Sequence, residues 1–272
     1  MTSFSVLMSV YYKESPEYLQ QALDSVFIQT LPANEVVLVE DGPLTEELCS
    51  VIEQYQEKHN ELKVIALKEN SGLGKALNEG LKNCSYELVA RADTDDISKP
   101  LRFEKQVAYM EEHPDIDVCS ASIDEFIDDT NNIVSIRALP IGHEALYKFG
   151  QKRNPINHPV SIFRKSAVEA VGGYKHFYLF EDYYLWARMM VNGSKFHNIK
   201  ESLLYFRFSP DMMKRRGGWK YAITEVKFQY ALFCLGYISF LRMSENITVR
   251  FGVRLIPNRI RKYIYTKYLR RN

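Results

Sequence analysis

The 272-residue sequence predicts an α/β protein built on an open, mixed and mostly parallel sheet flanked by helices. Two observations predict this class. Apolar runs of strand length alternate with segments of helical periodicity through residues 1–100. Turn-forming residues follow these runs, as in Asp41-Gly42-Pro43 and Asn70-Ser71-Gly72. The composition, 46% hydrophobic and 25% charged, is that of a globular protein and excludes disorder of the whole chain.

In the first half of the chain, strands and helices follow one another in order. We expect strands at residues 4–10, 35–40, 62–67 and 86–91. Helices begin at Pro16, where apolar residues recur at helical spacing as far as Phe27, and again near Glu46 and Gly74. Because ligands of such sheets bind at the carboxyl ends of the strands, functional side chains are expected there.

The second half is less regular. Helices are expected at residues 101–112, after Lys165 and at 181–190, and strands at 118–127 and 134–139. The segment Arg153–Phe163 contains two prolines and is interpreted as a shaped loop. Beyond Trp219, a long helical pattern leads to a basic end that Pro257 interrupts.

The net charge of +1 hides a basic C-terminal end. From Arg242 onward nine basic residues stand against one acid, a net of +8, which leaves −7 for the preceding residues. The apolar segment Tyr230–Leu241 is shorter than the about 20 residues of a membrane span, and we predict a buried or interfacial helix there. After Pro257 the pattern is typical of a helix on an anionic membrane surface. No nucleic-acid-binding motif accompanies this end, so nucleic acid is not an expected partner.

Other features point to a reducing compartment. The four cysteines are widely spaced, without the paired spacing of zinc sites or disulfide frameworks. The N-terminus shows no basic segment followed by a long apolar one, as a secretory signal would. With the basic end, these features predict a cytoplasmic protein bound peripherally to the inner face of the cytoplasmic membrane.

The segment Arg91–Asp96 carries the strongest chemical signal in the chain. Asp93, Asp95 and Asp96 place three carboxylates within four residues at the end of a predicted strand. Their mutual repulsion is unfavourable unless a cation or hydrogen-bond donors compensate it. A hard divalent ion that bridges to a diphosphate is one such compensation. The alternative is a solvated acidic turn that caps the following helix.

Two further segments bring carboxylates to informative places. Asp41 ends another strand of the sheet, at the same edge as the Asn70–Gly72 turn, although Asp before Gly42-Pro43 is also an ordinary turn residue. Glu181 and Asp182 begin a helix among aromatic side chains, which can stack on sugars and make an acid more basic. The alternative is that both are helix-start residues stabilised by the helix dipole.

In this order and spacing the motifs resemble glycosyltransferase family 2. The resemblance covers roughly residues 4–210 and rests on the segments Val6–Val10, Val39–Gly42, Asn70–Gly72, Ala90–Asp96, Gly172–Tyr174 and Glu181-Asp182. It implies a GT-A fold. Residues 1–215 would form the catalytic domain, with a nucleotide-sugar-binding half at 1–100 and an acceptor-binding half at 101–215. Residues 216–272 would form a helical, basic, membrane-associating extension.

The resemblance also implies roles for single residues. Asp182 would be the catalytic base, with Glu181 beside it as the second choice. Asp95 and Asp93 would hold the metal, Mn²⁺ or Mg²⁺. The donor nucleotide would be bound by residues near the strand ends: Val10, Tyr11, Glu14, Asp41, Asn70, Gly72, Arg91 and Asp93.

Two loops are expected to meet the diphosphate or the acceptor. Lys214, Arg215 and Arg216 precede two glycines, a composition suited to a mobile loop that closes on phosphates, although it also suits a solvated basic turn. The segment Arg153–Pro159 resembles the loop that precedes the acceptor site in bacterial members of the family. His158 within it is a candidate contact, but an isolated histidine is usually structural.

The reaction that the resemblance implies is an inverting transfer of a hexose, glucose or galactose, from a UDP-sugar. The acceptor would be a hydroxyl of a lipid diphosphate-linked sugar in O-antigen or capsule assembly. One alternative is a nucleotidyltransferase, which would carry a glycine- and lysine-rich signature; Val10–Glu14 contains no glycine. Another is a non-catalytic nucleotide-sugar-binding scaffold, which the presence of both Asp95 and Asp182 disfavours.

Overall fold

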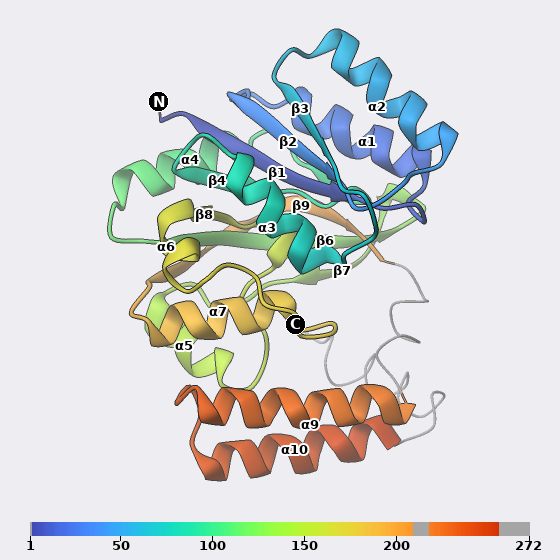
Figure 1. The fold of residues 1–272 in the computed structure, drawn as a ribbon. Coiled ribbons are helices and arrows are strands. Elements are labelled where there is room, and N and C mark those ends of the chain that lie inside the picture. Colours follow the sequence, from blue (N-terminus) through green and yellow to red (C-terminus); the bar gives the residue numbers. More distant parts are fainter. Residues whose placement is uncertain (1, 209–217, 256–272) are drawn as a thin grey trace.

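The computed structural model describes residues 2–208 and 218–255 (Figure 1). The strands are β1 Phe4–Val10, β2 Glu35–Glu40, β3 Leu62–Ala66, β4 Leu88–Arg91, β5 Ile97–Ser98, β6 Val118–Ile127, β7 Asp129–Arg137, β8 Ile162–Arg164 and β9 Phe196–Arg207. The helices are α1 Pro16–Phe27, α2 Glu46–Lys58, α3 Leu73–Asn83, α4 Arg102–Glu112, α5 His143–Gly150, the 3₁₀ helix η1 His158–Val160, α6 Lys165–Ala170, α7 Glu181–Val191, α9 Gly218–Cys234 and α10 Phe240–Leu255.

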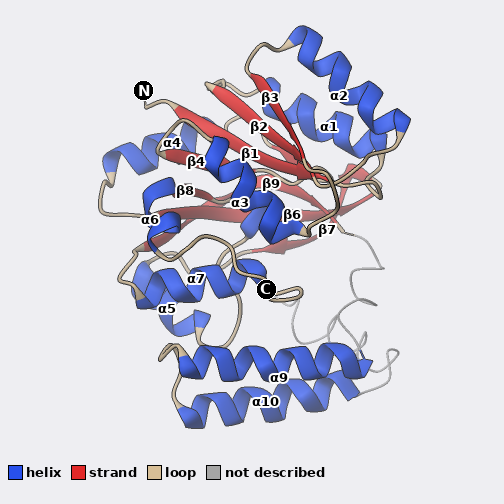
Figure 2. Cartoon of the chain, in the orientation of Figure 1, coloured by secondary structure: helices blue, strands red, loops and turns tan. Residues whose placement is uncertain are grey.

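All the described strands belong to one sheet in the order β3-β2-β1-β4-β8-β6-β9-β5, with β7 paired to β6. The pairs β1–β2, β2–β3, β1–β4 and β6–β9 are parallel, and the remaining pairs are antiparallel. Figure 2 shows the strands fanning through the middle of the molecule with helices on both faces. The predicted mixed α/β sheet is confirmed.

Successive side chains of the first strands point to opposite faces of the sheet, and helices cover both faces. In β1, Val6 and Met8 join a core cluster with α1, α2 and α4, whereas Leu7 joins the cluster that contains α3 and α7. In β2, Val36 and Val37 divide between the two clusters in the same way. Since both faces are buried, these strands appear in the sequence as continuous apolar runs.

Three strands of the second half differ from the prediction. The segment expected to be a loop ends in β8, which lies inside the sheet between β4 and β6. The long β9 was not predicted at all. β7 starts at Asp129 instead of residue 134, because Asp128 adopts a left-handed conformation with φ 61° and reverses the chain at once.

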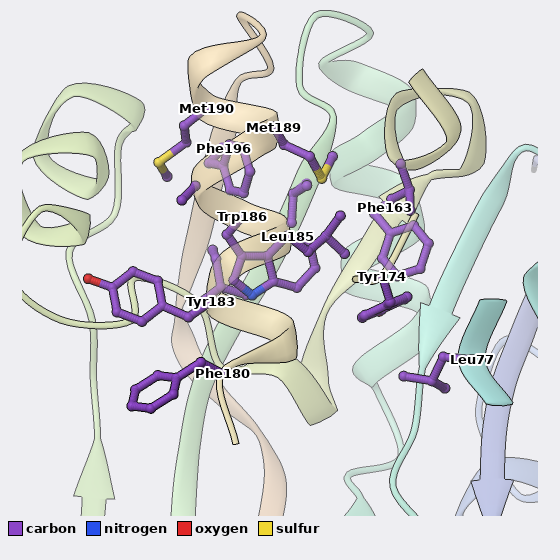
Figure 3. Packing of buried hydrophobic residues seen from close by; sticks show 14 of the residues in the cluster. Leu77, Phe163, Tyr174, Phe180, Tyr183, Leu185, Trp186, Met189, Met190 and Phe196 are labelled. Atoms are coloured by element: carbon purple, nitrogen blue, oxygen red, sulfur yellow. The ribbon is translucent and has the colours of Figure 1, made fainter. Parts of the chain in front are cut away.

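The core of the second half centres on Trp186 of α7, whose side chain is fully buried. Figure 3 shows its indole between Phe163 of β8 and Phe196 of β9. Their ring centroids lie 6.4 and 6.0 Å from that of Trp186. Asp182 is one helical turn before Trp186 in α7, so the packing of this core fixes where the predicted base lies.

The C-terminal helices form a hairpin that continues the same core. Phe228 of α9 stacks on Phe180 with centroids 4.4 Å apart and an interplanar angle of 14°. The single helix predicted over Tyr230–Leu241 is wrong, because Gly236 adopts φ 78°, a conformation that ends α9. Tyr237 then turns into the core, 1% exposed. Within the described residues, no helix has the length and apolar character needed to cross a membrane.

Docking of the hairpin yields a stability prediction. A Cβ at Gly150 of α5 would overlap the Tyr237 hydroxyl. We expect Gly150→Ala to lower the free energy of unfolding by about 1–3 kcal/mol through overpacking. In a Tyr237→Phe background the same change should cost clearly less, because the overlapping oxygen is gone. Urea denaturation of the four proteins measures this coupling.

Gly142→Ala, at the other end of α5, is the matched control, because a Cβ there meets no atom within 4 Å. Strictly additive effects of Gly150→Ala and Tyr237→Phe would contradict this account of how the hairpin docks.

Candidate functional site

A cavity of about 1200 Å³ opens at the carboxyl ends of β1, β2 and β4 and extends to α7 and α10. The sequence-predicted residues that line it come from six separate segments of the chain. They are Tyr11, Glu14, Asp41, Asn70, Gly72, Arg91, Asp93, Asp95, His158, Glu181 and Asp182. Val10 is packed in the core at 0% exposure and does not line the cavity. Lys214, Arg215 and Arg216 fall outside the described residues.

Asp41 shapes the turn opposite it. Its two carboxylate oxygens accept hydrogen bonds from the backbone amides of Ser71 (2.6 Å) and Gly72 (3.0 Å). The side-chain amide of Asn70 donates to the Asp41 carbonyl at 3.1 Å. Gly42 allows this close approach, because a Cβ there would lie 2.5 Å from the Asn70 nitrogen and its φ is 85°. A direct contact of Asp41 with a nucleotide stays a prediction.

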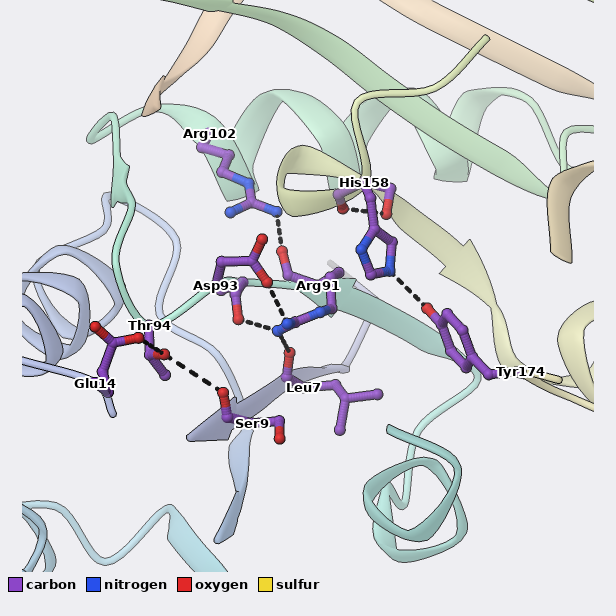
Figure 4. A network of polar contacts seen from close by, with 11 residues as sticks. Leu7, Ser9, Glu14, Arg91, Asp93, Thr94, Arg102, His158 and Tyr174 are labelled. Carbon is purple, nitrogen blue, oxygen red and sulfur yellow. Dashed lines mark hydrogen bonds and ion pairs between the residues drawn. The ribbon is translucent and has the colours of Figure 1, made fainter. Parts of the chain in front are cut away.

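Two buried arginines lie beneath the acidic cluster. Figure 4 shows the Arg91 guanidinium between the Leu7 carbonyl, to which it donates at 2.9 Å, and the carboxylate of Asp93, with which it forms an ion pair. Arg102 donates to the Arg91 carbonyl and, at 2.9 Å, to the Ser98 hydroxyl. Burial and the charge of Arg91 lower the pKa of Arg102 to about 9. Arg91, 1% exposed, therefore positions Asp93.

The carboxylates of Asp93, Asp95 and Asp96 each offer an oxygen within 4.8 Å of the others. Asp96 Oδ1 accepts from the Arg207 amide at 2.8 Å, while its buried Oδ2 has no hydrogen-bond partner among the described residues. The Asp95 side chain is exposed to the cavity, but the cavity wall removes much of the water around its carboxylate. This desolvation, with the charges of Asp93 and Glu14, raises the pKa of Asp95 to about 7. An all-oxygen cluster with an unpaired acceptor fits a hard divalent cation.

Glu14 is fixed beside this cluster. Its Oε2 accepts from the Thr94 hydroxyl at 2.8 Å (Figure 4). Its Oε1 accepts from the Ser15 amide at 2.9 Å. Arg207 closes the same side: its Nε donates to the Asp95 carbonyl at 2.9 Å, and its guanidinium lies 3.9 Å from the Tyr18 ring centroid. Sequence reasoning missed Arg207 because it missed the whole of β9.

Asp182 lies at the first turn of α7, partly buried. Its Oδ2 accepts a hydrogen bond from the Asn154 side-chain amide at 2.7 Å, and no described residue bonds the other oxygen. Burial raises the pKa of the neighbouring Glu181, whose Oε1 lies 3.9 Å from His176 Nδ1. Asn154 was not predicted, although a polar side chain inside the predicted acceptor loop was the available signal.

His158 has a structural partner. Its Nε2 lies 2.9 Å from the Tyr174 hydroxyl, and burial lowers the pKa of the imidazole, which favours the neutral form. Tyr174 is in turn fixed by Asn78, whose side chain bonds both its amide and its carbonyl at 2.7 Å. Asn78 of α3 thus ties the parallel strands to the half of the cavity that carries Asp182.

Residues 5–172 match glycosyl transferase family 2. The chain is also 42% identical to the UDP-Gal:alpha-D-GlcNAc-diphosphoundecaprenol beta-1,3-galactosyltransferase of Escherichia coli, over 98% of this chain and 97% of that one. The protein belongs to glycosyl transferase family 2. Another relative, the amylovoran biosynthesis glycosyltransferase AmsE of Erwinia amylovora, is 40% identical over 97% of this chain and 98% of its own.

Solved structures support the fold assignment. The crystal structure of S. aureus TarS matches 98% of this chain with a TM-score of 0.67 and 21% identity, and this chain spans 46% of TarS. The mannosyltransferase PcManGT from Pyrobaculum calidifontis, in complex with GDP-Man and Mn²⁺, matches with a TM-score of 0.63 and 16% identity, over 92% of this chain and 69% of its own. The family 2 protein described here is a glycosyltransferase with a GT-A fold. Such enzymes commonly use a divalent metal, and the Asp93-Asp95-Asp96 cluster suits their DxD motif.

The raised pKa of Asp95 predicts a pH-dependent stability of the metal-free protein. Its carboxyl group has an ordinary pKa near 3.9 in the unfolded chain and a pKa of about 7 in the folded one. Ionisation therefore destabilises the fold progressively from about pH 4 to pH 7. We expect Asp95→Asn in EDTA to be more stable than the wild type at pH 8, by about 1 kcal/mol because solvent in the cavity screens the charge. Near pH 4 the difference should vanish.

Urea denaturation at both pH values measures this difference. Glu57→Gln on the exposed face of α2 is the control, and its free energy of unfolding should differ little from that of the wild type at either pH. A stabilisation by Asp95→Asn that is equal at pH 4 and pH 8 would rule out the charge as its origin.

Proposed function

We propose that this protein transfers galactose, with inversion, from UDP-galactose to a hydroxyl of N-acetylglucosamine carried by a lipid diphosphate, in the assembly of a cell-surface polysaccharide. The observation that carries the proposal is that Asp182, Asp93 and Asp95 line one cavity. The substrates are those of the 42% identical galactosyltransferase of E. coli, and the 40% identical AmsE takes part in the biosynthesis of amylovoran. Galactose is one of the two hexoses that the sequence led us to expect.

The two halves of the cavity would divide the substrates. We assign the nucleotide to the half formed by residues 1–100. There Tyr11, Glu14, Asp41 and the Asn70–Gly72 turn surround the strand ends. UDP-GlcNAc and UDP complexes are known for the TarS fragment of the same fold. Asp95 and Asp93 would hold Mn²⁺ or Mg²⁺, with Asp96 completing the cluster. When bound, such an ion supplies charge neutralisation for the diphosphate leaving group.

Asp182 is the proposed general base. The acceptor oxygen attacks the anomeric carbon as the bond from that carbon to the diphosphate oxygen breaks on the opposite face, and the hydroxyl proton passes to Asp182. Asn154 holds one oxygen of this carboxylate and leaves the other for the proton. A positioned base of this kind contributes roughly 10²- to 10⁴-fold to the rate. Glu181 is the second choice, since it packs toward α3 beside Gly74.

The proposal is tested by measuring UDP release from UDP-galactose with Mn²⁺ and a lipid diphosphate-linked N-acetylglucosamine acceptor. We expect Asp182→Asn to lower kcat at least about 100-fold and to keep UDP-galactose affinity. Asp95→Ala should instead lose metal-dependent donor binding, as EDTA does for the wild type. Glu144→Gln, an exposed acid of α5, is the control.

Two other outcomes would redirect the assignment. If both variants lost UDP affinity equally, the separation of base and metal ligands would be wrong. If the wild type bound UDP-galactose but the acceptor never stimulated UDP release, a non-catalytic scaffold would replace the enzyme.

We further propose that the protein works in the cytoplasm, on the inner face of the cytoplasmic membrane, and has no nucleic-acid partner. Exposed apolar side chains on the C-terminal hairpin support this: Trp219, Ile223, Tyr230, Phe233, Phe240 and Leu241. Leu241 is 79% exposed, and the chain from Arg242 onward carries the +8 charge that an anionic lipid surface attracts. The tail after Pro257, predicted as a surface helix, lies outside the described residues.

Vesicle binding tests this location. We expect Leu241→Glu to weaken binding to phosphatidylglycerol vesicles roughly tenfold or more, because an exposed leucine that would insert into the lipid is replaced by a charge that the anionic surface repels. Deletion of residues 258–272 should weaken binding without unfolding the protein. Ile28→Glu is the matched control, an apolar-to-acidic change at a 68% exposed site that caps the C-terminus of α1. Equal loss in the Ile28 and Leu241 variants would argue against the hairpin as the docking face.

A further inference from the structure

Two cations in the cavity wall have no role in the reaction described so far. Lys152 and Arg153 follow α5, line the cavity and are exposed. Neither side chain has a hydrogen-bond or ion-pair partner in residues 2–208 or 218–255. Most exposed lysines and arginines are simply solvated, so a binding role requires that the backbone and the surroundings select their position.

The backbone of this segment is fixed by α10. Asn246 donates from its side-chain amide to the Gln151 carbonyl at 2.9 Å. One turn later Arg250 donates to the Lys152 carbonyl and is itself paired with the buried Glu225. On the other side, the amides of Lys152 and Arg153 both donate to the Phe149 carbonyl at 2.9 Å. The hydrogen bonds thus hold the main chain and leave the two cationic side chains available.

The segment is also tied to the proposed base. Asn154, the residue that follows Arg153, donates to Asp182 at 2.7 Å. An acceptor sugar whose hydroxyl reaches Asp182 would therefore share the cavity with Lys152 and Arg153, which line it. In the acceptor of the proposed function, the diphosphate is attached to that same sugar, one ring away from the reacting hydroxyl.

The distribution of charge favours the acceptor over the donor as the source of that diphosphate. The wall around Asp93, Asp95 and Glu14 is acidic, and there a cation on the aspartates would meet the donor diphosphate. The acceptor diphosphate has no such ion in reach and needs cations of the protein. On the hairpin side, Glu225 neutralises Arg250 and Arg242 pairs with Glu245, so that Lys152 and Arg153 remain uncompensated.

The geometry points to Lys152 and Arg153 as the subsite for the diphosphate of the lipid-linked acceptor, an inference that rests on the proposed function. The guanidinium of Arg153 binds one phosphate through two parallel hydrogen bonds, and Lys152 contributes a point charge to the diphosphate. The lipid then leaves the cavity over Val249 of α10, which lines the cavity and is 60% exposed. Figure 1 shows that this helix lies beyond α5 and α7, away from the parallel strands.

Kinetics with two acceptors test the subsite. One is N-acetylglucosaminyl diphosphate on a short lipid, and the other is the same sugar on a neutral alkyl linker. We expect Lys152→Ala/Arg153→Ala to raise KM for the diphosphate acceptor roughly 10- to 100-fold, the effect of lost charge-assisted hydrogen bonds. KM for UDP-galactose and the rate with the neutral acceptor should stay unchanged. Arg153→Lys should restore only part of the loss, because a lysine cannot bind a phosphate through two parallel bonds.

Lys148→Ala is the matched control, an exposed lysine of α5 outside the cavity lining. Thermal melting shows whether each variant is folded. An unchanged KM for the diphosphate acceptor in the double variant would overturn the subsite, and so would an equal loss with the neutral acceptor.

Direct binding separates this inference from the proposed function. Titration of the short-lipid N-acetylglucosaminyl diphosphate into the UDP-saturated protein requires no turnover. The wild type could bind this acceptor but transfer no sugar to it, while the double variant loses the binding. That outcome would support the subsite and reject the proposed reaction. Transfer by the wild type combined with equal binding to the double variant would support the reaction and reject the subsite.

Discussion

The acidic cluster can exist only because two fully buried guanidinium groups lie beneath it. Burial raises the pKa of Asp96 well above its usual range, and the charges of Asp95 and Asp93 raise it further. Arg91 pairs with Asp93 and binds the Leu7 carbonyl of β1, while Arg102 reaches from α4 to the carbonyl of Arg91. Because a buried charge that loses its partner is strongly destabilising, these cations and carboxylates depend on one another. The arrangement thereby connects β1, β4 and α4 at the edge where the cavity opens.

A second set of contacts brings the other half of the cavity to this edge. Between β4 and β6 lies the three-residue β8, and η1 just before it carries His158 against Tyr174. Asn78 of α3 holds Tyr174 through both of its backbone groups. The helix that presents Asp182 is anchored by Trp186 in the core shared with β8 and β9. Donor-side carboxylates and the proposed base thus face one space because the sheet is continuous across the two halves.

The sequence predicted the first four strands and eleven of the residues that line the cavity. β1, β2 and β4 could be predicted because burial of both faces produces apolar runs, and Asp41 and Asp93 follow two of those runs at the strand ends. β3 is half-exposed and was predicted from the shorter apolar segment 62–67. β9 could not be found in this way, because a register shift between Ile199 and Ser202 interrupts its alternation and its burial pattern is irregular. β8 is too short for any periodicity and is stable only between its neighbours.

Single side chains show a similar limit. Arg91 and Asp41 were recognised from motifs, yet the structure uses their polar groups to shape the site: Arg91 bonds Leu7 and Asp93, and Asp41 bonds the Ser71 and Gly72 amides. Asn154 and Arg207 went unpredicted, because their importance comes from contacts with Asp182 and Asp95 that only the tertiary structure creates. A residue type at a strand end indicates that a site is present, whereas the partner of each side chain depends on segments far away in the chain.

The C-terminal hairpin connects the acceptor side of the cavity to an exposed apolar surface. Asn246 and Arg250 lie on the face of α10 that holds the segment before Asn154, while Phe240 and Leu241 at the start of the same helix are exposed. A helix that rested on lipid through those exposed residues would hold the acceptor-side wall of the cavity near the membrane surface. An acceptor with a lipid tail needs such an arrangement, since its sugar must reach Asp182 while the tail stays in the bilayer. Because Phe228 and Tyr237 pack into the main core, a hairpin that rested on lipid would hold the cavity at a fixed position relative to the membrane.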